Sequence, residues 1–99
     1  MSEALEITTF APAGDHTGAD FVAANADIDD YLRRQPGFRW RRTTVRDDGI
    51  VVDIVAWGTR GEAESAARGI TTEMGGSPVH SRIDQGTVDW QIVEVLHSL

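Results

Sequence analysis

The residue of this 99-residue sequence with the clearest chemical potential is Asn25. It recurs at helical spacing with Phe21, Ile28 and Leu32, which predicts that its amide faces the sheet on which this helix packs. A buried amide needs hydrogen-bond partners, and in a pocket it could hold a substrate carbonyl or an enolate oxygen. The alternative is an asparagine that hydrogen-bonds to a loop backbone or to a neighbouring strand.

Asp53 and His80 are the candidate groups for proton transfer. Asp53 is the one carboxylate in the otherwise apolar run 50–57, where burial would raise its pKa and make it a base. An ion pair with Arg41 or Arg42 is the alternative, because buried charges are usually paired. His80 could transfer protons near neutral pH at the mouth of a pocket, or it could be a solvated loop histidine.

Four aromatic side chains are the candidates for substrate binding, namely Phe21, Tyr31, Trp40 and Trp57. Aromatic walls suit a flat polycyclic ligand, whereas packing in the core or in a dimer interface is the alternative. A two-residue turn at Asp48-Gly49 would place Trp40 and Trp57 opposite each other across a hairpin. A three-residue turn would direct these two side chains to opposite faces of the sheet.

The elements that must position these side chains follow the order β-α-β-β-α-β. Alternating or apolar runs predict strands over residues 5–10, 38–46, 50–57 and 87–96, with a bulge near Ile92-Val93. Capping residues and helical spacing predict helices over 17–34 and about 60–74, with a short turn of helix over 77–83. We therefore expect one α+β domain over residues 1–99, with a ferredoxin-like four-stranded antiparallel sheet.

The strand over residues 50–57 indicates that both faces of this sheet are covered. Val51, Val55 and Trp57 share a face with Asp53, and the intervening side chains on the opposite face are apolar as well. Helices can cover one face, and the other would be a large exposed apolar patch in a single chain. We expect two sheets to pair face to face in a homodimer, and we expect a small-molecule ligand as a second partner.

Composition restricts the classes of function. The net charge of −7 argues against a nucleic-acid partner, and the lack of cysteine excludes disulfides and thiolate chemistry. No spacing of histidines and carboxylates predicts a metal site, no glycine-rich phosphate loop is present, and we expect no cofactor. The acidic first residues and the lack of an apolar run of ~20 residues favour a cytoplasmic protein with no membrane contact.

Several segments carry a resemblance to a known group of proteins. They are Phe21-Val22-Ala23-Ala24-Asn25, Tyr31-Leu32, Gln35-Pro36-Gly37-Phe38, and Asp48-Gly49 followed by Val52-Asp53-Ile54-Val55-Ala56-Trp57 and an alanine-rich helix. Over about residues 5–95 the chain resembles the dimeric α/β-barrel proteins of the antibiotic biosynthesis monooxygenase type. That superfamily includes cofactor-independent oxygenases of quinol-like substrates, haem-degrading enzymes, lactone isomerases and polyketide cyclases. The resemblance therefore implies the fold and a dimer, and leaves several chemistries open.

The haem-degrading branch of that superfamily can be tested residue by residue. It uses an Asn on the first strand, a Trp on the third and a His on the second helix. Trp57 matches the Trp, but Ala67 stands where the His is expected, and residues 5–10 contain no Asn. Haem degradation is therefore disfavoured.

The resemblance implies a cofactor-independent monooxygenase that acts on a small aromatic or polyketide-type molecule. Such an enzyme binds an electron-rich phenol or enol, favours its anion and lets dioxygen react in a dry pocket. Asn25 or an arginine would favour the anion, and Asp53 or His80 would be the base. Two alternatives remain: a non-catalytic dimer that binds a ligand or supports a partner, and an isomerase or cyclase, which needs a base but no oxygen.

Overall fold

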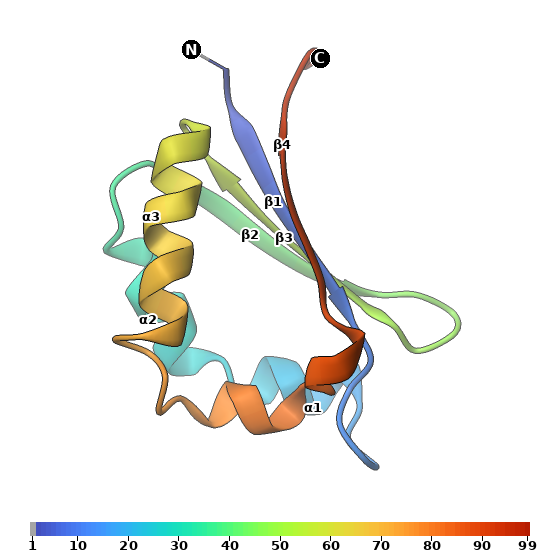
Figure 1. Cartoon of the computed structure of the whole chain (residues 1–99). Helices are drawn as coiled ribbons and strands as arrows, with labels where there is room; N and C mark the ends of the chain where they lie inside the picture. The colour runs from blue at the N-terminus through green and yellow to red at the C-terminus, as the bar shows by residue number, and fades with distance from the viewer. Residues whose placement is uncertain (1) are drawn as a thin grey trace.

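The computed structural model describes residues 2–99, in which one antiparallel sheet has helices against one face (Figure 1). The strands are β1 (Ala4–Phe10), β2 (Phe38–Val45), β3 (Val51–Trp57) and β4 (Asp89–Glu94), in the sheet order β2-β3-β1-β4. The helices are α1 (Gly18–Ala23), α2 (Ala26–Arg33) and α3 (Arg60–Thr71), with the short 3₁₀ helices η1 (Pro78–Arg82) and η2 (Gln85–Thr87). The predicted α+β class and ferredoxin-like order of elements are confirmed. No helix among the described residues is long and apolar enough to cross a membrane.

The first helical segment differs from the single helix predicted over residues 17–34. It begins as expected, because Thr17 and Asp20 form a reciprocal capping box, but it breaks at Asn25 into α1 and α2. The side-chain amide of Asn25 donates to the carbonyl of Phe21, which the Asn25 backbone N–H would use in a continuous helix. That N–H donates instead to the carbonyl of Val22, 3.1 Å away. The prediction of one helix was therefore wrong.

The other two predicted helix starts are confirmed. The hydroxyl of Thr59 accepts from the backbone N–H of Glu62 at the start of α3, and the hydroxyl of Ser77 accepts from that of Val79 at the start of η1. Pro78 occupies the first turn of η1, where its missing N–H costs no hydrogen bond. These caps fix where α3 and η1 begin, and both elements carry side chains of the candidate site.

The hairpin between β2 and β3 has a three-residue turn. The N–H of Arg46 donates to the carbonyl of Ile50 at 2.8 Å, and Gly49 has a φ of +87°. Only glycine adopts this conformation at little cost, so the Asp-Asp-Gly sequence suits the turn. In this register Trp40 pairs with Ala56, and Trp57 lies one position further along β3. Trp40 and Trp57 therefore point to opposite faces, as expected for a three-residue turn.

The irregularity of the sheet is in β2 and not in β4. The register between β2 and β3 shifts between Phe38 and Trp40, which lets Phe38 pack edge-on against the ring of Trp57 at 5.8 Å. The pairing of β1 with β4 is regular through Ile92 and Val93, so the bulge predicted there was wrong. Both residues are apolar because each faces a different side of the sheet, and no backbone irregularity is needed to explain them.

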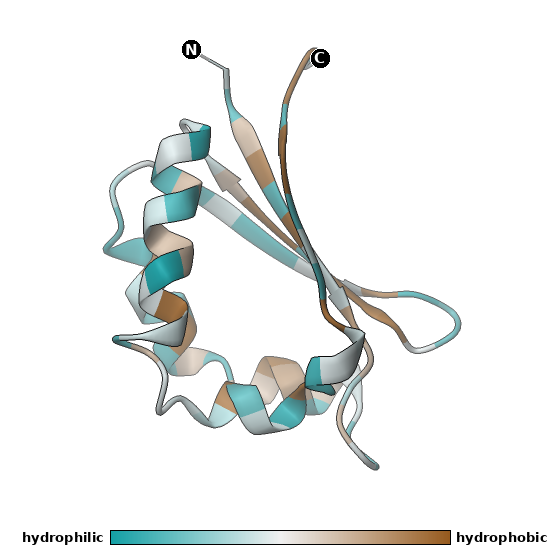
Figure 2. Cartoon of the chain, in the orientation of Figure 1, coloured by the Kyte–Doolittle hydropathy of each residue, from teal (hydrophilic) through white to brown (hydrophobic). Residues whose placement is uncertain are grey.

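The two faces of the sheet have different chemistry. Glu6 pairs with Val55 and Thr8 with Asp53, so these four side chains share the face that the helices cover. The alternate residues of the two central strands point to the outer face, and they are Leu5, Ile7, Thr9, Val52, Ile54 and Ala56. In Figure 2, β3 is mostly hydrophobic, whereas β2 and much of α3 are hydrophilic. The core cluster lies on the helix-covered side, with Phe10 and Phe21 edge to face at 4.7 Å.

Candidate active site

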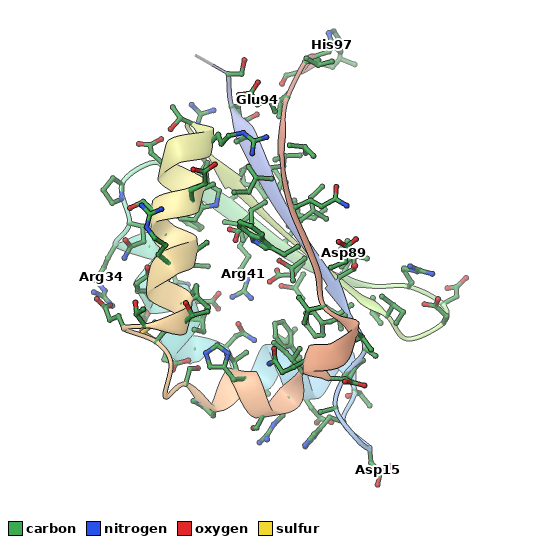
Figure 3. All side chains as sticks on the ribbon, in the orientation of Figure 1. Asp15, Arg34, Arg41, Asp89, Glu94 and His97 are labelled. Atoms are coloured by element: carbon green, nitrogen blue, oxygen red, sulfur yellow. The ribbon has the colours of Figure 1, made fainter. Side chains whose placement is uncertain are left out.

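A cavity of about 560 Å³ lies between the sheet and the helices. Its sheet side is formed by residues of all four strands, including Glu6, Thr8, Asp53 and Trp90. Its helix side is formed by α1, α2 and α3, and η1 adds His80. Figure 1 shows the helices against one face of the sheet, and Figure 3 shows side chains that project between the two layers. A volume of this size suits a small organic ligand.

The polar side of the cavity is organised by Arg41 on β2, which points into the space between sheet and helices (Figure 3). Its guanidinium binds the carboxylate of Asp53 in a bidentate manner, with N–O distances of 3.0 and 2.7 Å. It also donates to Asp29 on α2 at 2.9 Å, and Thr43 donates to Asp53 at 2.9 Å. Burial opposes the charge of Arg41, but hydrogen bonds and the charges of Asp53 and Asp29 outweigh burial and raise the pKa of Arg41.

Asp53 therefore lies in the ion pair that was the alternative to a catalytic base. The side chains of Arg41 and Asp53 are only 10% and 11% exposed, so the pair is largely buried. Both carboxylate oxygens of Asp53 already accept hydrogen bonds from a cation. The geometry therefore gives Asp53 the role of holding Arg41, and through it the β2–β3 hairpin, against α2.

Asn25 lines the cavity and is 4% exposed. Its amide nitrogen donates to the carbonyl of Phe21 at 2.5 Å, which leaves the oxygen Oδ1 directed away from that bond. Oδ1 is buried and accepts no hydrogen bond from the described residues. Buried oxygens without a partner are rare, so Oδ1 stands out as an acceptor in a cavity-lining residue that the described residues leave unused.

His80 also lines the cavity, from η1. Its Nε2 lies 2.9 Å from the carbonyl oxygen of Met74. Because a carbonyl only accepts, this contact places the proton on Nε2 and leaves Nδ1 as the acceptor of the neutral ring. The predicted position of His80 beside a pocket therefore agrees with the structure, and its orientation is fixed by the segment that follows α3.

The four aromatic candidates do not gather at one site. Phe21 lines the cavity, and the guanidinium of Arg41 lies 5.8 Å from the centre of its ring. Tyr31 lies in the core, where its hydroxyl donates to the carbonyl of Ala66 at 2.7 Å. Trp57 is fully buried, and its indole donates to Glu6, which lines the cavity. Trp40 lies on the outer face, where the guanidinium of Arg42 covers its ring at 4.3 Å.

Glu6 and Trp90 are the site residues that the sequence analysis missed. Glu6 projects from β1 into the cavity and accepts from the indole of Trp57 at 3.1 Å and from that of Trp90 at 2.7 Å. Burial raises the pKa of Glu6, and the two indole hydrogen bonds only partly oppose this rise. The signal for Glu6 was present: a carboxylate in mid-strand that alternates with Leu5 and Ile7. It was overlooked because alternating strands usually direct their polar residues to solvent.

The comparisons with known proteins agree on the fold. No family model matches the chain, and no curated protein matches it in sequence. An asparagine-to-alanine variant of SnoaB, a cofactor-independent oxygenase from Streptomyces nogalater, superimposes with a TM-score of 0.76 at 18% identity, over 100% of this chain and 98% of that chain. The monooxygenase ActVA-Orf6 of Streptomyces coelicolor, solved with the ligand nanaomycin D, superimposes with a TM-score of 0.68 at 17% identity, over 99% of this chain and 91% of that chain.

A third solved structure, Rv0793 from Mycobacterium tuberculosis, gives a TM-score of 0.65 at 18% identity, over 98% of both chains. Likeness at this level of identity shows the fold and not the reaction. The expectation drawn from the sequence resemblance is confirmed for the architecture: this chain has the ferredoxin-like fold of the antibiotic biosynthesis monooxygenases, over its whole described length.

Proposed function

We propose that the protein is a cofactor-independent oxygenase that takes a small aromatic or polyketide-type phenol or enol into the cavity between sheet and helices. The observation that carries this proposal is the free oxygen of Asn25, an acceptor buried in the wall of a ligand-sized space. The likeness of the fold to SnoaB and ActVA-Orf6 supports the choice of reaction.

The polar groups of the cavity favour a ligand that donates hydrogen bonds. Asn25 offers an oxygen, the ring of His80 offers Nδ1 when Nε2 alone carries a proton, and Arg41 is already paired with two carboxylates. A quinol or an enol can donate to such acceptors, whereas the corresponding quinone has only acceptors and leaves them unpaired. We therefore propose that the reduced, hydroxylated form of the substrate binds.

The proposed roles follow from these positions. Asn25 accepts from one hydroxyl group and fixes the orientation of the ring, and Phe21 forms an aromatic wall beside it. His80, at the η1 side, accepts a second hydroxyl or relays a proton. Asp53 acts through Arg41 and keeps that side of the cavity rigid. Trp57 borders the site, and Tyr31 and Trp40 take structural roles.

The dimer is part of the proposal. The outer face of the sheet carries Leu5, Ile7, Val52 and Ile54, and no element of the described chain covers it (Figure 1). A second copy that pairs through the same face would bury these side chains and Trp40 with them. The single domain over residues 1–99 and the cytoplasmic location stay predictions.

Oxygen uptake tests the proposal. Purified protein is mixed with 1,4-naphthoquinol, anthrone or a flavonoid, and dioxygen consumption is compared with that of buffer. We expect uptake above buffer with at least one compound and a loss of roughly tenfold or more in Asn25→Leu, since a hydrogen bond to the substrate disappears and a buried partner is left unpaired. Uptake equal to buffer with every compound contradicts the proposal.

Gln35→Leu is the matched control for Asn25→Leu. The Gln35 amide also donates to the carbonyl four residues before it, that of Tyr31, at 3.0 Å, but Gln35 does not line the cavity. We expect Gln35→Leu to leave oxygen uptake unchanged. Repeating any active assay under nitrogen separates an oxygenase from an isomerase or cyclase, because only the oxygenase loses product formation.

A further inference from the structure

We propose that Glu6 is the proton acceptor of this site and that its carboxylate takes the hydroxyl proton of a bound phenol or enol. This inference rests on the proposed function and deepens it, because it assigns the base to a residue on β1 in place of Asp53 or His80. It also specifies the substrate as a phenol or enol that enters the cavity with its hydroxyl group protonated and loses that proton there.

The geometry around Glu6 holds the carboxylate without using up its capacity to accept. β1 lies between β3 and β4, and each neighbour sends one indole to Glu6: Trp57 donates to Oε1 at 3.1 Å and Trp90 to Oε2 at 2.7 Å. Each carboxylate oxygen accepts about two hydrogen bonds, so each keeps a site for a further donor. Because Glu6 lines the cavity, that donor can be a ligand hydroxyl.

The other two candidate bases have fewer free acceptor positions than Glu6. Both oxygens of Asp53 bind the guanidinium of Arg41, and Oδ1 accepts from Thr43 as well. The Nε2 of His80 is bound to the carbonyl of Met74, which leaves Nδ1 as its one acceptor nitrogen. Glu6 makes no ion pair with any described residue, so no cation fixes its carboxylate in the charged form.

The electrostatic surroundings of Glu6 suit a base. Burial raises its pKa, the indoles of Trp90 and Trp57 lower it, the charge of Asp53 raises it, and Arg41 lowers it. The further charged or titratable side chains that line the cavity are Glu64 and Arg68 on α3 and His80 on η1. The net effect is a rise, and a carboxylate of higher pKa binds a proton more strongly, so it is a better acceptor for a weakly acidic hydroxyl.

The step itself is a proton transfer. The substrate O–H bond breaks, a new O–H bond forms on the Glu6 carboxylate, and the electron pair stays on the substrate oxygen. The product is a phenolate or enolate beside a neutral Glu6, so the total charge of the pair does not change. The anion is the electron-rich form that reacts with dioxygen, which is the oxidant of the proposed function.

The test is made under nitrogen, so that ionisation is measured without oxygenation. Full-length protein is titrated with 7-hydroxyflavone at a pH at which the free flavone is neutral, and the phenolate absorption band is recorded. We expect the band to appear with the wild type and to fall at least tenfold in Glu6→Gln, while tryptophan quenching shows that the flavone still binds. Glu94→Gln, at an exposed residue of β4 outside the cavity lining, is the control and keeps the band.

A second variant reports on Glu6 without removing it. Trp90→Phe keeps an aromatic ring but loses the N–H that lowers the pKa of Glu6. The midpoint of phenolate formation should therefore move to higher pH, which a merely structural role of Trp90 would not cause. If Glu6→Gln fails to fold, this shift alone decides the matter.

The outcomes separate the two proposals. A phenolate band of wild-type strength in Glu6→Gln, or an unmoved midpoint in Trp90→Phe, overturns the role of Glu6. An ionised flavone without oxygen uptake from any quinol supports Glu6 and overturns the oxygenase. Failure of the wild type to bind any of the flavone, anthrone and 1,4-naphthoquinol overturns both.

Discussion

The two faces of the sheet reverse the usual distribution of polar and apolar residues. In most α+β domains the face that packs on helices is apolar and the other is polar. Here the centre of the helix-covered face carries Glu6, Thr8 and Asp53, while the outer face of the same strands carries Ile7 and Ile54. The polar residues are on the side that the chain itself encloses.

The positions of the side chains along each face explain this reversal. The helix-covered face is apolar at its two ends, where Phe10 and Val51 pack at one end and Phe38 and Trp57 at the other. Only its middle is polar, and there the side chains line a cavity or bind one another. On the outer face, the described residues form no charged network like that of Arg41, Asp53 and Asp29. A face of that composition is suited to packing against protein, and the enclosed face to holding a ligand.

The largest expected effect comes from two adjacent arginines on opposite faces. Arg41→Met leaves the buried Asp53 and its neighbour Asp29 without their cation, and we expect the free energy of unfolding to fall by about 3–5 kcal/mol. Arg42→Met removes an exposed guanidinium stacked on Trp40, and we expect the free energy of unfolding to fall by only about 0.5–1 kcal/mol. Urea denaturation followed by circular dichroism, at one protein concentration, measures both. Equal losses of unfolding free energy in the two variants would show that the ion pairs of Arg41 stabilise the fold no more than the exposed contact of Arg42 does.

The next effect concerns the outer face and the dimer. Ile54→Asp places a carboxylate in the middle of the proposed interface, so we expect the dimer dissociation constant to rise by roughly a hundredfold or more while the chain stays folded. Sedimentation equilibrium measures the change. Val45→Asp is the control, since Val45 is 60% exposed and pairs with Val51 on the covered side. A wild-type chain that is monomeric at high concentration refutes the interface.

The sequence carried enough information for the architecture and for much of the site. Helical and alternating periodicity gave the order of elements, and the capping hydroxyls of Thr17, Thr59 and Ser77 gave the helix starts. An ion pair of Asp53 with Arg41 or Arg42 was the alternative to a base, because an isolated charge in an apolar strand needs a partner, and the structure shows the pair with Arg41. These inferences depend on local patterns or on one cross-strand contact, and both can be read along the chain.

The rest depends on tertiary context that no local pattern specifies. The break at Asn25 comes from a side-chain amide that competes with a backbone N–H, in a stretch whose periodicity continues across it. The alternation around Glu6 fixes that Leu5 and Ile7 share a face, but not which face the helices cover. Trp90 joins the site only because β4 pairs with β1, 84 residues apart in sequence from Glu6.

A smaller effect is expected where α3 approaches α2 on the covered side. A Cβ added to Gly69 would overlap the ring and hydroxyl of Tyr31, so Gly69→Ala should destabilise the fold by about 1–3 kcal/mol although alanine is the better helix former. Tyr31→Phe removes the overlapping hydroxyl. The double variant with Tyr31→Phe and Gly69→Ala should lose less stability than the sum of the losses in the two single variants, because the clash is partly relieved. Thermal or urea unfolding of the four proteins gives the coupling, and strict additivity would contradict the contact.

The smallest expected effect is the pH dependence that Glu6 adds to stability. Burial raises the pKa of Glu6 in the folded state, so the folded chain holds the carboxyl proton of Glu6 more tightly than the unfolded chain does. In the unfolded chain a glutamate titrates near pH 4.3. The stabilisation that protonated Glu6 contributes is therefore complete below about pH 4.3, and it is lost as the pH rises through the raised pKa of the folded state. Glu6→Gln has no such titration, so wild-type stability should fall relative to that of the variant across this window.

The acid end of the pH range provides the control. There the wild-type glutamate and the substituted glutamine are both neutral, so the part of their difference in free energy of unfolding that does not depend on pH can be measured. Urea unfolding at a series of pH values, followed by tryptophan fluorescence, gives the difference between the two proteins. Parallel curves would mean that Glu6 titrates alike in both states. A difference of opposite sign would mean that the indoles of Trp57 and Trp90 hold the carboxylate charged, and the enclosed face would then bind anions more readily than it accepts protons.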